Sequence, residues 1–252
     1  MNTPRAPRSV GARLGSIVHR AQELGISTHA RRLLWRVGYD LRPALSGLDG
    51  QRLRLLETLG ITTLVDVGAN DGAWALQQRR LGFTGRIISI EPDPRCLVPL
   101  RERAARDGSW TVHAAAAGAE RGSATLHRHE SSLLNSLHAE SDAAGTTVAD
   151  AIEVEVRALD ELLGDLAALG GAYLKIDTQG HELDVLRGCP RLLAAARGVE
   201  VEFAVRDYYE GAPSRVALEE LLLDAGLALA SIQTERFLDG RPIDMDAIYI
   251  RA

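Results

Sequence analysis

The pattern of hydrophobic and polar residues changes along the chain. Between residues 11 and 38, apolar residues recur at helical spacing, which predicts two helices separated near Gly25 and Ser27. From Leu53 onward, short apolar runs alternate with segments of helical periodicity. Such alternation is typical of an α/β protein built from βαβ units.

The alternating part predicts seven strands with helices between most of them. We expect strands at residues 63–67, 86–90, 111–115, 172–176, 199–205, 227–233 and 246–251, and helices at residues 53–60, 73–81, 96–106, 159–169, 182–196 and 215–225. A polar, hairpin-like insert spans residues 123–156, and a turn at Asp239 and Gly240 joins the last two strands. The prediction is an α/β fold with a doubly wound, mostly parallel seven-stranded sheet, whose last strand is antiparallel.

Length and composition indicate one core. With 252 residues, 46% of them hydrophobic, the chain can bury one full-sized core. We therefore predict one α/β domain at residues 56–252, preceded by a helical cap or extension at residues 1–55. No apolar run approaches the roughly 20 residues that a membrane span requires. The N-terminus has no apolar signal core, and Cys96 and Cys189 are too few for a disulfide framework, so we expect a cytoplasmic protein.

Charge is distributed unevenly along the chain. Residues 1–42 hold eight arginines but only Glu23 and Asp40 as acidic residues, a local charge of +6 that leaves −11 for the rest of a chain whose net charge is −5. The acidic body argues against nucleic acid as a partner. We favour a solvated, partly helical basic arm, with weak contact to an anionic membrane surface as the alternative. Of the 29 basic residues only Lys175 is a lysine, which suggests a specialised position.

A glycine-rich turn follows the first strand of the α/β domain. Residues 66–72 read Asp-Val-Gly-Ala-Asn-Asp-Gly, and glycine at positions 68 and 72 lets a ligand approach the backbone closely. Alone, this turn also fits a plain connection between strand and helix. Glu91 follows the next strand, where an acidic side chain can accept both hydroxyls of a ribose, although a solvated carboxylate is the alternative. Together the two features predict a cofactor at the strand carboxyl ends.

The polar residues of the turn indicate which cofactor it holds. A dinucleotide needs helix amides pointed at its pyrophosphate. Asp66, Asn70 and Asp71 would oppose a diphosphate, but they suit the ammonium of an amino acid such as that of S-adenosylmethionine. The turn therefore favours S-adenosylmethionine over a nicotinamide dinucleotide.

Five segments stand in a fixed order along the chain. They are residues 65–72 (Val-Asp-Val-Gly-Ala-Asn-Asp-Gly), 90–94 (Ile-Glu-Pro-Asp-Pro), 131–133 (Ser-Ser-Leu), 174–182 (Leu-Lys-Ile-Asp-Thr-Gln-Gly-His-Glu) and 185–188 (Val-Leu-Arg-Gly). Together, in this order, they resemble the FkbM-type methyltransferases of the class I, Rossmann-like fold. The resemblance implies transfer of a methyl group from S-adenosylmethionine, usually to a hydroxyl on a sugar, glycolipid or other natural product, as in glycan modification or secondary metabolism. It also implies a cofactor site at Asp66, Gly68, Ala69, Asn70, Asp71, Gly72, Glu91 and Pro92.

A second cluster of chemistry lies around the strand at residues 172–176. Lys175 and Asp177 are two residues apart and so share a face, with Ile176 on the other. A structural Lys–Asp pair is the alternative to a catalytic one. Asp177 and His181 are the candidates for taking a proton from the acceptor hydroxyl, and Lys175 would orient Asp177 or bind the acceptor.

The insert and the segment after the fifth strand supply candidate substrate residues. The family resemblance suggests that Ser131 and Ser132 help to line the mouth of the site, and Tyr208 could form a wall for the acceptor. His127 and His129 would point the same way on a strand, but no third ligand stands at convincing spacing. We therefore predict no metal site.

The leading interpretation is an S-adenosylmethionine-dependent O-methyltransferase with a small-molecule or glycan acceptor. One alternative is a nicotinamide-dependent oxidoreductase on a similar sheet, disfavoured because the single lysine, Lys175, forms no Tyr-x-x-x-Lys pair. The other is a non-catalytic protein that binds S-adenosylmethionine, since methyl transfer requires few obligatory side chains. The sequence does not determine the oligomeric state.

Overall fold

The computed structural model describes residues 47–138, 148–205, 214–238 and 241–251. The chain divides into two compact units, Met1–Leu55 and Leu56–Ala252, and the sheets belong to the second. The helices predicted at residues 11–38, the basic arm and the turn at Asp239 and Gly240 lie outside the described residues and stay predictions. Among the described helices, none combines the length and the hydropathy needed to cross a membrane.

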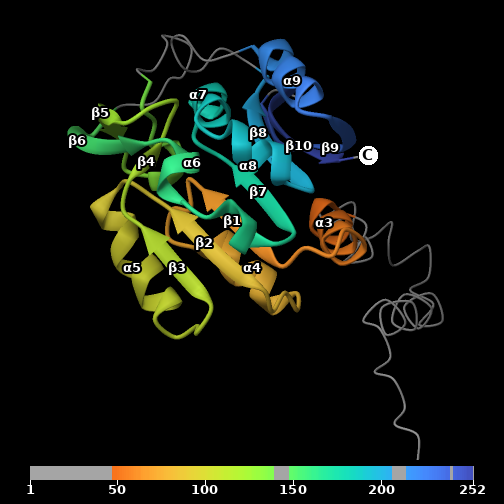
Figure 1. Ribbon diagram of the computed structural model, residues 1–252. Coiled ribbons are helices and arrows are strands. Elements are labelled where there is room, and N and C mark those ends of the chain that lie inside the picture. Colours follow the sequence, from red (N-terminus) through yellow and green to blue (C-terminus); the bar gives the residue numbers. More distant parts are fainter. Residues whose placement is uncertain (1–46, 139–147, 206–213, 239–240, 252) are drawn as a thin grey trace, which may run out of the picture. The chain divides into compact units, whose positions relative to one another are not determined.

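The second unit contains the predicted seven-stranded sheet (Figure 1). Its strand order is β3-β2-β1-β7-β8-β10-β9, and β10 is antiparallel to both of its neighbours while the pairs from β3 to β8 are parallel. The strands are β1 (Thr63–Val67), β2 (Arg86–Ile90), β3 (Trp110–His113), β7 (Ala172–Ile176), β8 (Gly198–Ala204), β9 (Leu227–Leu238) and β10 (Arg241–Arg251). The predicted fold class is therefore confirmed.

Helices follow most of the parallel strands, as expected for a doubly wound sheet. Helix α3 (Leu48–Thr58) comes before β1 in the chain. The helices after β1 are α4 (Ala73–Arg80), α5 (Pro94–Ala104), α6 (Leu159–Leu162), α7 (Glu182–Arg187), α8 (Pro190–Ala195) and α9 (Arg215–Asp224), with short 3-10 turns η1 (Ser132–Leu134) and η2 (Leu166–Leu169). The main core joins one face of the sheet to α6, α7, α8 and α9 through aliphatic side chains such as Leu174, Val185 and Leu222. This packing holds the strand carboxyl ends in fixed positions.

Two predicted helices are interrupted. The segment 159–169 divides into α6 and η2, and the segment 182–196 divides into α7 and α8. The second break falls at Gly188 and Cys189, with Pro190 as the first helical residue of α8. A Cβ atom at Gly188 would lie 1.9 Å from the carbonyl oxygen of Gly118, so the chain needs glycine where it passes this turn. The sequence did not reveal this break, because the helical spacing of apolar residues continues from α7 into α8.

The polar insert forms a small sheet of its own. Strands β5 (Gly122–Arg128) and β6 (Asp150–Arg157) pair antiparallel, and β4 (Ala116–Ala117) pairs parallel with β6. A small apolar cluster that includes Leu126 and Val154 supports this sheet. The predicted hairpin-like character of the insert is confirmed, whereas the strand predicted at 111–115 ends at His113 because the next alanines turn into the small sheet.

A row of buried polar side chains crosses the opposite face of the large sheet. Ser89, Asp66, Lys175 and Glu200 are register partners on β2, β1, β7 and β8, and all four are buried. We call these four residues the polar row. Helix α4 lies on this face of the sheet. Its residue Trp74 stands over the row, with its ring centre 5.7 Å from the ammonium of Lys175. The row therefore places ionisable side chains on this face of the sheet. Those of Asp66 and Lys175 stand one residue before the carboxyl ends of their strands.

Candidate active site

A pocket opens at the carboxyl ends of β1, β2 and β7, beside the polar insert. Its empty space, including the side open to solvent, is about 630 Å³. Backbone and side chains from the two sheets line it together. The predicted site residues in its walls are Gly68, Asn70, Glu91, Pro92, Ser132, Asp177 and His181.

The glycine turn forms one end of the pocket. Gly68 and Gly72 have φ angles of +77° and +82°, and Asn70 also lies in the left-handed region at +50°. The amides of Gly68 and Ala69 donate to the carbonyl oxygen of Ile90, which ties the turn to β2. A Cβ atom at Gly68 would lie 1.8 Å from the carbonyl oxygen of Asp177. The turn can take this path only with glycine at position 68.

Glu91 stands at the end of β2, next to this turn. Its carboxylate accepts hydrogen bonds from the backbone amides of Asn70 and Asp93, both at 2.8 Å. The side chain is almost fully buried, and this burial raises the pKa of Glu91 to about 7, although the two amides act in the opposite direction. A strand-end carboxylate that lines a pocket can accept the hydroxyls of a ribose.

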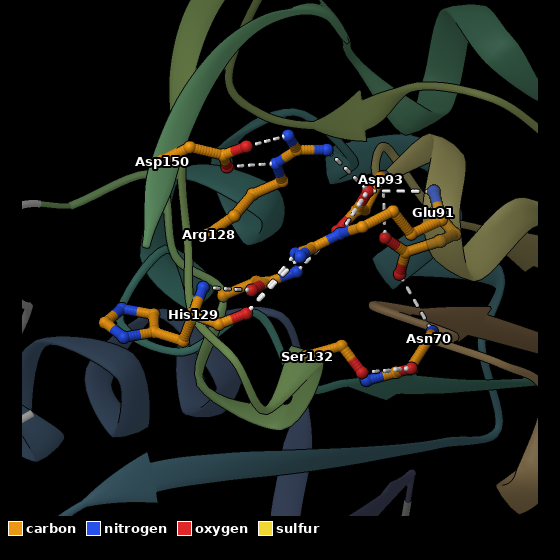
Figure 2. A network of polar contacts seen from close by, with 9 residues as sticks. Asn70, Glu91, Asp93, Arg128, His129, Ser132 and Asp150 are labelled. Carbon is orange, nitrogen blue, oxygen red and sulfur yellow. Dashed lines mark hydrogen bonds and ion pairs between the residues drawn. The ribbon is translucent and has the colours of Figure 1, made fainter. Parts of the chain in front are cut away.

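A network of hydrogen bonds and ion pairs joins the insert to the glycine turn and to the start of α5 (Figure 2). The buried carboxylate of Asp93 accepts from the backbone amide of Arg95 at 2.9 Å and from the side-chain amide of Asn135 at 2.8 Å, and it pairs with Arg128 at 3.5 Å. These contacts, with those of the Arg95 guanidinium, hold the pKa of Asp93 below its usual value despite its burial. The hydroxyl of Ser132 donates to the side-chain oxygen of Asn70 at 3.0 Å. We call these contacts the Asp93 clasp.

Lys175 and Asp177 form an ion pair at the carboxyl end of β7, beside the glycine turn. Nζ of Lys175 lies 3.0 Å from Oδ2 of Asp177, and Oδ1 of Asp177 accepts from the side-chain amide of Gln179 at 2.9 Å. Burial acts to raise the pKa of Asp177, but the Lys175 ammonium and the hydrogen bonds hold it below its usual value. The predicted contact between the two residues is confirmed. Asp177 is thus an ionised, oriented acceptor of hydrogen bonds.

Asp66 lies deeper than its neighbours in the turn. Its side chain is fully buried in the polar row, 3.7 Å from Nζ of Lys175, and neither carboxylate oxygen accepts a hydrogen bond from a described residue. Burial raises the pKa of Asp66 to about 6, while Lys175 acts in the opposite direction. For Lys175 itself, burial lowers the pKa, but Asp177 and Asp66 together hold it above its usual value. The lysine therefore stays charged and holds two carboxylates.

His181 lies at the N-terminal end of α7 and reaches the same pocket. Its Nδ1 is 3.3 Å from Nε2 of His138 and 3.6 Å from Oδ2 of Asp184. Burial lowers the pKa of His181, and the neighbouring His138 acts in the same direction, although Asp184 opposes both. His181 is therefore neutral near pH 7.

Other predicted residues lie close to the pocket without lining it. Asp71 pairs with Arg103 at 2.9 Å, and Gly72 precedes α4. Ala69 is buried in the turn, and Ser131 precedes η1. Tyr208 lies outside the described residues. The cofactor and substrate roles of these residues stay predictions.

Some wall residues were missed by the sequence analysis. The run Ala115 to Ala117, Leu126 and Leu137 supply an apolar wall, and Thr178 and Gln179 complete the turn after β7. Gln179 has a φ of +53° and bonds both Asp177 and Glu202. A signal for Gln179 was present, since it stands in the segment that carries the family resemblance. The apolar wall gave no signal because alanine and leucine are equally common in cores.

The sheet order and the position of the pocket define a class I methyltransferase fold, Rossmann-like with an antiparallel last strand. The chain belongs to the FkbM methyltransferase family, since the methyltransferase FkbM domain matches residues 66–227.

The chain is also similar to individual proteins. It is 25% identical over 170 residues to the 2-O-methyltransferase NoeI of Sinorhizobium fredii, which covers 63% of this chain and 70% of that protein. The crystal structure of methyltransferase FkbM from Methylobacillus flagellatus matches with a TM-score of 0.48 and 18% identity, over 74% of this chain and 43% of that one. Magnesium protoporphyrin IX methyltransferase from Synechocystis, solved with bound S-adenosylmethionine, matches with a TM-score of 0.42 and 12% identity, over 99% and 100% of the two chains.

Proposed function

We propose that the protein is an S-adenosylmethionine-dependent O-methyltransferase. The carrying observation is that one pocket holds Glu91, at the end of β2 beside the glycine turn, and Asp177, which follows β7 and is fixed by Lys175. We call Gly68, Asn70, Glu91 and Pro92 the cofactor end, and Ser132, Asn135, Asp177 and His181 the acceptor end. Membership of the FkbM family supports methyl transfer.

The residues at the cofactor end fit S-adenosylmethionine. Gly68 lets the turn pass close to the backbone of Asp177 and also lines the pocket. Glu91 offers a carboxylate for the ribose hydroxyls, and Asn70 offers an amide beside it. When bound, S-adenosylmethionine supplies a methyl group on a positively charged sulfur. Most of the protein's contribution to such a displacement is alignment of the acceptor and exclusion of water.

At the acceptor end, Asp177 accepts the hydrogen bond of the acceptor hydroxyl and takes its proton. Lys175 and Gln179 fix the orientation of the carboxylate, because each donates a hydrogen bond to a different one of its two oxygens. His181 is the second candidate for this proton, because its neutral imidazole lines the same pocket. Because the pKa of Asp177 is low, the proton moves to it only as the bond between the methyl group and the acceptor oxygen forms.

The acceptor we propose is a hydroxyl on a sugar, glycolipid or natural product. The relative named as a 2-O-methyltransferase supports oxygen as the methylated atom. The acidic balance of the chain outside residues 1–42 supports a small molecule or glycan over nucleic acid.

Two measurements test this function. Calorimetric titration of the purified chain with S-adenosylmethionine and with NADH should show binding of the former only. Mass spectrometry after incubation with S-adenosylmethionine and a panel of sugars, glycolipids and polyketide-like alcohols should show the gain of one methyl group on an oxygen. NADH binding without S-adenosylmethionine binding would overturn the cofactor, and methylation confined to nitrogen or carbon would overturn the acceptor atom.

A further inference from the structure

Three side chains with metal-binding atoms meet beside the pocket. Within the described residues, His138, His181 and Asp184 place one ligand atom each within 4.8 Å of the others. His138 comes from the insert, whereas His181 and Asp184 stand at the first turn of α7. We call these residues the His–His–Asp cluster. All three are half-buried, and His181 also lines the pocket.

Two of the three distances between the ligand atoms are those of a tetrahedral cation site, and the third, between His138 and Asp184, is at most 4.8 Å. With metal–ligand bonds of about 2.05 Å, two ligands of a tetrahedral zinc ion lie roughly 3.3 Å apart. Nδ1 of His181 is 3.3 Å from Nε2 of His138 and 3.6 Å from Oδ2 of Asp184. Two imidazoles and one carboxylate also form the donor set of catalytic zinc sites, which keep a fourth position open.

The surroundings prepare these side chains for coordination. Oδ1 of Asp184 accepts a hydrogen bond from the guanidinium of Arg187 at 3.0 Å, which leaves Oδ2 directed at His181. Such a bond from a neighbouring residue fixes the orientation of a metal ligand.

We propose that the His–His–Asp cluster binds a divalent cation of the zinc type, whose open position takes the oxygen of the acceptor hydroxyl. The role for the acceptor rests on the proposed function, whereas the cation site itself does not. A bound cation lowers the pKa of a coordinated hydroxyl. The O–H bond then breaks with its electron pair left on oxygen, and the proton passes to the carboxylate of Asp177. Lowering the pKa of the acceptor hydroxyl in this way makes transfer of its proton to Asp177 less unfavourable.

The cation site is tested by titrating the full chain, stripped with a chelator and dialysed, with ZnCl2 in a calorimeter. We expect one Zn²⁺ per chain, with affinity reduced at least tenfold in His138→Ala, in His181→Ala and in Asp184→Asn. Cobalt(II) should give the intense visible bands of a four-coordinate ion in the unaltered chain, and these should fade in the same variants. Far-UV circular dichroism confirms that each variant is folded.

The control is His127→Ala, which removes a histidine of the insert outside the cluster. It should bind Zn²⁺ as the unaltered chain does. Absence of Zn²⁺ binding, or binding lost in His127→Ala but kept in His138→Ala and His181→Ala, would overturn the site. The three ligands come from two separate segments of the chain. If one variant misfolds, Zn²⁺ titration of the other two still tests the site.

The outcome is separable from that of the proposed function. S-adenosylmethionine should bind His138→Ala as tightly as the unaltered chain, because His138 lies outside the cofactor end. Methyl transfer that proceeds at full rate in His138→Ala and in the presence of chelator would overturn the role of the cation and leave the methyltransferase intact. Zinc binding without methyl transfer to any hydroxyl would support the site and overturn the proposed function.

Discussion

The cofactor end and the acceptor end of the pocket are built in different ways. At the cofactor end, Gly68 and Asn70 belong to one turn, and Glu91 lies 21 residues from Asn70, to whose amide it bonds. At the acceptor end, Ser132 bonds to Asn70 across 62 residues, and His138 meets His181 across 43. The first end depends on the local path of the backbone, whereas the second depends on contacts between distant segments. Mutations should therefore affect the cofactor end through backbone sterics and the acceptor end through single side chains.

The largest effect is expected at the most constrained backbone position. Gly68→Ala places a methyl group 1.8 Å from the carbonyl oxygen of Asp177 at a φ of +77°. The clash and the left-handed backbone together should lower the free energy of unfolding by about 4 kcal/mol and abolish S-adenosylmethionine binding. Chemical denaturation and calorimetry measure the two effects. Gly122→Ala, where a Cβ meets nothing within 4 Å, is the control and should be neutral. A stable Gly68→Ala chain that binds the cofactor would show that the turn is adaptable.

A single side chain should dominate the acceptor end. Asp177→Asn keeps the shape of the side chain but removes the proton acceptor, so kcat should fall about 100-fold while the Kd of S-adenosylmethionine changes less than about threefold. Steady-state kinetics and calorimetry provide both values. Asp165→Asn makes the same chemical change at the start of η2 and should leave kcat unchanged. An unaltered rate in Asp177→Asn would show that Asp177 is not the base.

The cofactor end should respond to pH through Glu91. Burial raises the pKa of Glu91 to about 7. Only the ionised carboxylate can accept two ribose hydroxyls, so S-adenosylmethionine affinity should fall as the pH drops through 7, by roughly tenfold between pH 8 and pH 6. Calorimetry at the two pH values measures it. Glu91→Gln should bind weakly at both values, and an unaltered chain with equal affinity at both would remove Glu91 from the ribose site.

The smallest effect is expected where the two ends meet. Ser132→Ala deletes the hydrogen bond to the side-chain oxygen of Asn70, a contact of the Asp93 clasp. A partly exposed hydrogen bond contributes about 0.7 kcal/mol, so S-adenosylmethionine should bind about threefold more weakly. Calorimetry resolves such a change. Ser123→Ala, on an exposed position of β5, should leave the affinity unchanged. A loss of tenfold or more would mean that the insert orders the turn itself.

The same contrast explains which features could be predicted from the sequence. Strands β1, β2 and β7 have the predicted bounds, because each is a short, mainly apolar and β-branched segment with turn residues on both sides. The glycine turn is a motif within one short segment. Lys175 and Asp177 are two residues apart, which places both side chains on one side of the strand. Local physics fixes these features, so a single sequence reveals them.

The remaining features arise from packing between distant segments. Periodicity joined α7 to α8 because Leu186 and Leu192 both reach the core, and the need for glycine at position 188 comes from Gly118, seventy residues away. The contact between His138 and His181 is likewise invisible in the spacing of either segment. The Asp93 clasp depends on how the insert folds back over α5.

The buried position of Lys175 has a practical consequence. It is the only lysine of the chain, and its side chain is 9% exposed. Reagents that acylate primary amines should therefore modify the folded protein at its N-terminal amine, which would couple it to a sensor surface in one orientation. The intact mass should show a second acyl group only after the sheet has opened and exposed Lys175. The rate at which this second group appears would therefore measure how fast the domain opens.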